Sequence, residues 1–86
     1  MRKESIVQQL KLPRDICMGD MKITLMGQKE AWIENYRGII EYTDKKILLQ
    51  GKLGQVSFEG KGLHIDYYTY EDMKICGLIF GIQFIS

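Results

Sequence analysis

The sequence predicts a mainly β protein, with a short N-terminal helix followed by an antiparallel meander of about six to seven strands. Three observations support this fold class. Short runs of alternating apolar and polar residues follow one another from residue 22 to residue 84, Gly or Asp-Lys turn chemistry ends each run, and these turns recur at close spacing. Such a chain forms a curved sheet, a sandwich or a partly open barrel. Because the chain has 86 residues, we expect a single domain over residues 1–86.

An N-terminal helical arm is predicted over residues 4–12, where Ile6, Val7 and Leu10 lie on one helical face. Pro13 ends this helix, because a proline pushes the residue before it out of the α region. Isolated helices of this length are marginal in water, so the arm must pack against another surface. The two alternatives are its own β domain, which we favour, and a partner protein.

The β domain is predicted over residues 21–85. Gly27 stands at the tip of its first hairpin, residues 43–46 form a polar hairpin connection, and residues 60–62 (Gly-Lys-Gly) form a further turn. Asn35 suits a turn or left-handed backbone position, and Gly38 permits one. The strands between these turns are predicted at residues 21–26, 30–35, 37–42, 47–50, 55–58, 63–67 and 73–84.

The last run is apolar on both of its predicted faces. One face carries Leu78, Phe80, Ile82 and Phe84, and the other carries Ile75, Gly77, Ile79 and Gly81. Such a strand is either central and covered on both sides or presents its second face to another molecule. The two glycines on one side leave a bare strip that another backbone can approach, or they mark a bend or bulge.

Composition narrows the class of function. Twelve basic and eleven acidic residues give a formal net charge of +1, too small to attract nucleic acid or anionic lipid strongly. The longest apolar stretch is about half as long as a membrane-spanning helix, so we expect no direct membrane insertion. Residues 1–9 lack the apolar region of a secretory signal, which favours a cytoplasmic protein. In that compartment Cys17 and Cys76 are expected to be free thiols.

Reactive side chains do not gather anywhere in the sequence, so we expect no enzyme, no catalytic residue, no metal ligand and no cofactor. His64 is the single histidine and lies two positions from Asp66, so both point to one face of a strand. No activated nucleophile accompanies this pair, and neither the two-His nor the Cys-His spacing of a metal motif occurs. Residues 60–62 likewise lack the spacing of a phosphate-binding loop.

Several local motifs occur in an order that resembles the YabP/YqfC sporulation protein family, and its YqfC branch in particular. They lie at residues 10–15, 23–27 and 33–42, at Gly60 with Leu63 and Ile65, and at residues 75–79 with Ile82 and Phe84. The most specific is Ile-Glu-Asn-Tyr-Arg-Gly at residues 33–38. The resemblance implies a role in endospore formation in the mother cell of a spore-forming bacterium. It also implies a YqfD-like membrane protein as partner, and it supplies no catalytic residues.

We therefore expect a non-enzymatic adaptor that binds a protein partner through an apolar strand face or an open sheet edge. Because aromatic residues and Arg dominate interface energetics, the predicted partner-binding residues are Trp32, Tyr36, Arg37, Phe80 and Phe84. Arg37 lies between Glu34 and Glu41, which predicts an ion-pair patch.

Two alternatives remain open at this point. One is a scaffold that assembles with other copies of itself into oligomers or filaments. The other is a small barrel that binds nucleic acid or a sugar polymer in a groove lined by Tyr67, Tyr68 and Tyr70.

Overall fold

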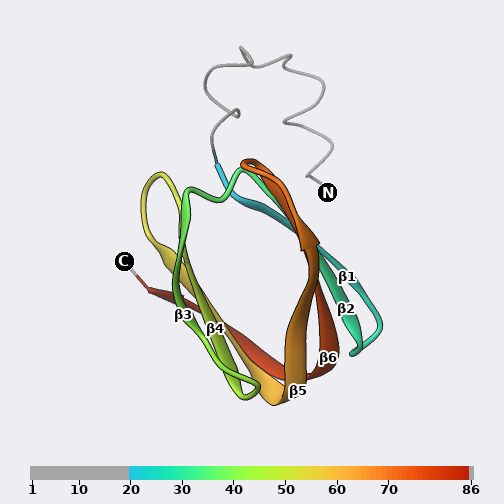
Figure 1. Ribbon diagram of the computed structural model, residues 1–86. Coiled ribbons are helices and arrows are strands. Elements are labelled where there is room, and N and C mark those ends of the chain that lie inside the picture. The colour runs from blue at the N-terminus through green and yellow to red at the C-terminus, as the bar shows by residue number, and fades with distance from the viewer. Residues whose placement is uncertain (1–19, 86) are drawn as a thin grey trace, which may run out of the picture.

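Residues 20–85 are described by a computed structural model, in which they form one six-stranded antiparallel sheet (Figure 1). The strands are β1 (Lys22–Met26), β2 (Glu30–Glu34), β3 (Gly38–Tyr42), β4 (Lys46–Gln50), β5 (Gln55–Tyr68) and β6 (Asp72–Ile85). The predicted all-antiparallel β domain is therefore confirmed. The helix predicted over residues 4–12 lies outside the described residues.

The strand order is β1-β2-β6-β5-β4-β3. The meander holds from β3 to β6, where each strand pairs with the next. The connection from β2 to β3 departs from it, because β2 pairs with β6 and the chain then crosses to the far edge of the sheet. Asn35 makes this departure possible. Its φ of 68° confirms the predicted left-handed position, and its N–H donates to the Glu71 carbonyl at 2.7 Å.

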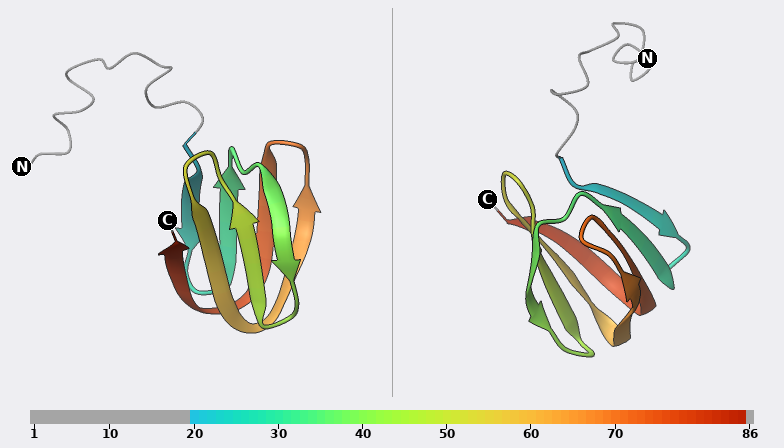
Figure 2. Two further views of the ribbon diagram at one scale, coloured as in Figure 1. Left: turned by 90° about the vertical axis from the view of Figure 1, so that its left-hand side faces the viewer. Right: turned by 45° about the horizontal axis from the view of Figure 1, so that its top comes forward.

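β5 and β6 are long and strongly curved, and their bend folds the sheet over on itself into two layers (Figures 1 and 2). The first layer contains β1, β2, residues 72–76 of β6 and the second half of β5. The second layer contains the first half of β5, the end of β6, β4 and β3. The result is a partly open barrel, one of the three predicted forms.

The bend corrects the prediction of a turn at residues 60–62, because β5 continues through them as one strand. The register between β5 and β6 shifts between Glu59 and Gly60 and again between Lys61 and His64. Here the two backbones approach more closely than side chains permit. A Cβ on Gly77, at φ 131°, would lie 2.6 Å from the Gly62 oxygen, and one on Gly60 would overlap the Leu78 carbonyl.

The hydrophobic core fills the space between the two layers. Ile33 and Ile75 from the first layer and Ile47, Leu49 and Phe58 from the second have no exposed surface. The alternation predicted for β5 is confirmed for Val56 and Phe58 but not for its opposite face, since Ser57 is 1% exposed. The remaining buried apolar residues are Ala31, Tyr36, Val56, Leu63, Met73 and Ile79.

Candidate functional site

Two seams run between the layers, where an edge strand of one layer lies near an edge of the other. At the first, which we call the closed seam, β5 meets the β3–β4 hairpin. The N–H groups of Gly60 and Leu63 donate to the Lys45 and Asp44 carbonyls at 3.0 and 2.8 Å, and the Ile65 N–H donates to the Tyr42 hydroxyl at 2.9 Å. The edge of β5 is therefore capped by the neighbouring hairpin.

At the second seam, which we call the open seam, β6 lies near β1 and the β1–β2 turn. The Gly77 N–H donates to the Lys29 carbonyl at 3.1 Å, and the Ile79 N–H donates to the Gln28 carbonyl at 2.8 Å. Beyond this point, residues 80–85 pair with β5 alone among the residues that the structure describes. One edge of β6 consequently keeps its backbone N–H and C=O groups free for another strand.

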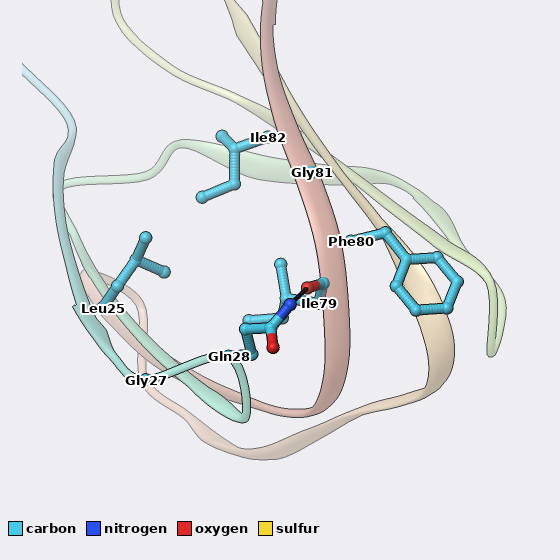
Figure 3. A pocket seen from close by; sticks show the side chains of 7 residues that line it. All are labelled: Leu25, Gly27, Gln28, Ile79, Phe80, Gly81 and Ile82. Atoms are coloured by element: carbon cyan, nitrogen blue, oxygen red, sulfur yellow. Dashed lines mark hydrogen bonds between the residues drawn. The ribbon is translucent and has the colours of Figure 1, made fainter.

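Two apolar hollows lie beside the end of β6, and we call them together the groove; Figure 3 shows the first of them. At its start a hollow of about 320 Å³ lies between Leu25 and Ile82, whose side chains point toward the same space from β1 and β6. The Gln28 side chain lies below them and its amide donates to the Ile79 carbonyl at 3.4 Å. Phe80 also borders this hollow, but its ring points to the opposite side of β6, away from Leu25 and Ile82.

A second hollow of about 250 Å³ lies at the far end of the same edge. It is bounded by Met21 before β1, by Leu53 in the β4–β5 loop and by Phe84 of β6. Phe84 stands opposite Val56 in the sheet register and so faces the interior, yet it is 74% exposed because nothing described covers it. Residues 75–85 also contain no charged side chain, which is unusual for an exposed edge.

The outer face of the first layer carries a second group of side chains, which we call the outer cluster. Trp32 stands opposite Lys74, and Lys74 stands opposite Tyr67 in the sheet register. The Lys74 ammonium lies 4.9 Å from the Trp32 ring centroid, and the Tyr67 ring meets Trp32 edge-on at 5.9 Å. Lys74 also lies between two carboxylates, 3.9 Å from Glu30 and 3.8 Å from Asp66.

The next row of the outer cluster pairs His64 on β5 with Cys76 on β6, and Asp66 lies beside them. Their possible ligand atoms are all within 4.8 Å of one another. Partial burial raises the pKa of the Cys76 thiol, with a smaller opposing effect from Lys74. Sequence reasoning missed this trio, because His64 and Cys76 are adjacent only through the pairing of β5 with β6.

The five predicted partner-binding residues do not form one site. Trp32 belongs to the outer cluster, Phe84 to the open seam, and Phe80 is 66% exposed on the other side of β6. Tyr36 is 6% exposed and its hydroxyl donates to the Thr69 carbonyl, so it is a core residue and not an interface anchor. The two strands that flank it, β2 and β3, lie apart in the sheet, so its burial depends on an arrangement that the sequence alone does not reveal.

Arg37 is exposed, and the ion-pair patch predicted around it does not form among the described residues. The structure instead pairs Glu41 with Lys46 at 3.8 Å, across the β3–β4 hairpin. The Arg37 backbone N–H donates to the Gln50 carbonyl at 2.7 Å. The specific segment at residues 33–38 therefore acts in the structure as a shaped corner between strands.

Comparison with known proteins identifies relatives of this chain. The family model described as the YabP family matches residues 18–86. An uncharacterized protein YqfC from Bacillus subtilis (strain 168) is 28% identical over 84 residues, which is 98% of this chain and 90% of that protein. No solved structure matches the chain. Within residues 20–85, no helix is long and apolar enough to cross a membrane.

Proposed function

This chain belongs to the YabP family, and we propose that it acts in endospore formation as a non-enzymatic adaptor whose open seam binds a strand of a protein partner. Family membership supports the process, and the open seam supports the mechanism. The expected site of action is the cytoplasm of the mother cell, at a membrane that carries the partner. A membrane protein resembling YqfD is the partner that the family suggests.

The single observation that carries this mechanism is the free edge of residues 80–85 beside an apolar groove. Free backbone groups supply hydrogen bonds to an added strand irrespective of its sequence. The hollows flanked by Leu25, Ile82 and Phe84 then receive alternate apolar side chains of that strand, which provides specificity. Because this edge lacks the charged residues that usually prevent pairing, strand addition is favoured here over the other edges.

A matched pair of variants tests this role. Phe84→Lys places a charge in the groove, whereas Phe80→Lys places the same charge on the opposite side of the same strand, at a similarly exposed position. We expect Phe84→Lys to reduce the yield of heat-resistant spores when it replaces the wild-type protein, and Phe80→Lys to leave that yield unchanged. Recovery of a membrane protein with wild type and Phe80→Lys, but not with Phe84→Lys, would identify the partner.

The proposal fails if both variants accumulate normally and support sporulation equally well. Loss of sporulation in both variants alike would also oppose it, because the groove side of β6 would then have no special role. Immunoblots of the two proteins at the time of sampling control for abundance.

Self-assembly is the second candidate, favoured by the same uncharged edge. A second copy offers an identical strand, and two such edges pair antiparallel about a two-fold axis. Sedimentation velocity over a range of concentrations separates the two candidates. A monomer at all concentrations supports the adaptor, and growth into dimers or longer assemblies that Phe84→Lys abolishes supports the scaffold.

A further inference from the structure

Three side chains with metal-binding chemistry meet on the outer face of the first layer. The His64 imidazole, the Asp66 carboxylate and the Cys76 thiol come from β5 and β6, and their ligand atoms all lie within 4.8 Å of one another. His64 and Asp66 are exposed and Cys76 is half-buried, so an ion reaches all three from solvent. These three groups serve no role in the open seam.

The fold holds these groups together through its strand pairing. His64 stands directly opposite Cys76, and the register shift between Ile65 and Tyr67 gives Asp66 an extra position on the β5 side. At the neighbouring bend the backbones of Gly62 and Gly77 approach so closely that a Cβ on Gly77 would lie 2.6 Å from the Gly62 oxygen. The trio is therefore a product of the bend and not of a local sequence motif.

The backbone beside His64 also orients its ring. Nδ1 lies 3.3 Å from the Gly62 carbonyl oxygen, a contact that suits the neutral tautomer with its proton on Nδ1, because a carbonyl can only accept. The lone pair is then on Nε2, the nitrogen that remains for a ligand bond. A backbone carbonyl in this position is a common outer partner of metal-binding histidines.

We propose that His64, Asp66 and Cys76 bind one divalent transition-metal ion, with Zn²⁺ as the preferred occupant and a fourth position open to water or to a donor from another molecule. A thiolate with an imidazole selects zinc over magnesium or calcium, which prefer oxygen ligands. Ligand atoms around a tetrahedral zinc lie about 3.5 Å apart, so the trio closes by about an ångström on binding.

Lys74 offers a test in which metal binding should become tighter instead of weaker, because its ammonium competes with the ion for the Asp66 carboxylate. Its ammonium lies 3.8 Å from the Asp66 carboxylate, and its second partner, Glu30, is not among the three ligands. Lys74→Gln removes the competing charge and leaves the ligands in place. We expect this variant to bind the metal about two- to fivefold more tightly than wild type.

The experiment is a titration of the full, tag-free, reduced chain with Co²⁺, followed by displacement with Zn²⁺. A thiolate bound to Co²⁺ gives a charge-transfer absorption in the near ultraviolet, and we expect it at one equivalent in wild type. Cys76→Ser should abolish this band, and His64→Gln should weaken binding at least about tenfold. Cys17→Ser, which removes the other cysteine, should bind as wild type does.

Circular dichroism of each variant confirms that the β fold is intact, because all three ligands lie on the sheet surface. The proposal is overturned if wild type shows no charge-transfer band, or if Cys17→Ser and not Cys76→Ser removes it. Asp66 is not a ligand if the Lys74→Gln and Asp66→Asn variants both bind Co²⁺ with the affinity of wild type. None of these outcomes depends on sporulation, so this site and the proposed adaptor role stand or fall separately.

Discussion

The closed seam and the open seam both lie where the two layers of the folded sheet meet. They differ in how far the neighbouring hairpin covers the strand edge. At the closed seam the β3–β4 hairpin supplies two carbonyls and the Tyr42 hydroxyl to the edge of β5. At the open seam the β1–β2 turn supplies two carbonyls and a glutamine amide, and the contact ends at Ile79. The described residues therefore cover the edge of β5, whereas the edge of β6 after Ile79 keeps free backbone groups and apolar surface.

The cause of the difference lies in the two hairpins. The Thr43 hydroxyl accepts hydrogen bonds from the N–H groups of Lys45 and Lys46 at 3.2 and 2.9 Å, which fixes the shape of the turn whose carbonyls bind β5. At the other hairpin β1 is an outer strand of the first layer and, within residues 20–85, pairs with β2 alone, while β6 passes into the second layer. The strands on the two sides of the open seam therefore diverge.

The largest expected effect is at the bend on which both seams depend. Gly77→Ala forces an alanine into φ 131° with its Cβ against the Gly62 backbone, and we expect a loss of roughly 3 kcal/mol or more in the free energy of unfolding. Gly81→Ala is the matched control on the same strand, since a Cβ there meets no atom within 4 Å. Its cost should stay within about 0.5 kcal/mol. Urea unfolding followed by circular dichroism measures both, and equal costs would contradict this account of the bend.

A smaller effect is expected at the closed seam. Tyr42→Phe removes the hydroxyl that accepts the Ile65 N–H, and we expect a loss of about 1 kcal/mol in unfolding free energy. Tyr70→Phe, at a side chain that is 87% exposed, should leave stability unchanged. If urea unfolding finds the two variants indistinguishable, Tyr42 does not seal the seam.

The smallest effect on stability is expected at the open seam. Phe84 is 74% exposed, so Phe84→Lys removes little packing, and its unfolding free energy should stay within about 0.5 kcal/mol of wild type. A much larger loss in the same urea titration would mean that Phe84 is covered in the folded chain. The open seam would then be a part of the core and not a free surface.

Much of this fold is readable from residue alternation and turn chemistry. The positions of β1 to β4 and the hairpins at Gly27 and residues 43–46 match the prediction to within a residue or two. The bend was missed because Gly-Lys-Gly at residues 60–62 has the chemistry of a turn, and glycines permit a close approach of two backbones just as well. To distinguish a turn from a close approach of two backbones, one must know which strand lies beside these glycines.

Bulges explain why the faces of β6 were assigned incorrectly. The register shift opposite Gly60 leaves Phe80 unpaired, so Ile82 and Phe84 face the interior while Phe80 faces outward. A strict alternation put all three on one face. The groove, the burial of Tyr36 and the His64–Asp66–Cys76 trio likewise depend on which strands are neighbours, and that information is absent from local spacing.

The pairing of β2 with β6 has a consequence for how the protein is made. The ribosome synthesises β1 and β2 long before β6. Glu30 of β2 therefore has no partner in the sheet until Cys76 of β6 has been made. Until then the nascent β1–β2 hairpin has two unpaired edges, and a lone hairpin is marginal in water. The first layer is thus completed only after most of the chain has been synthesised, and a factor present during translation meets a strand that the finished protein conceals.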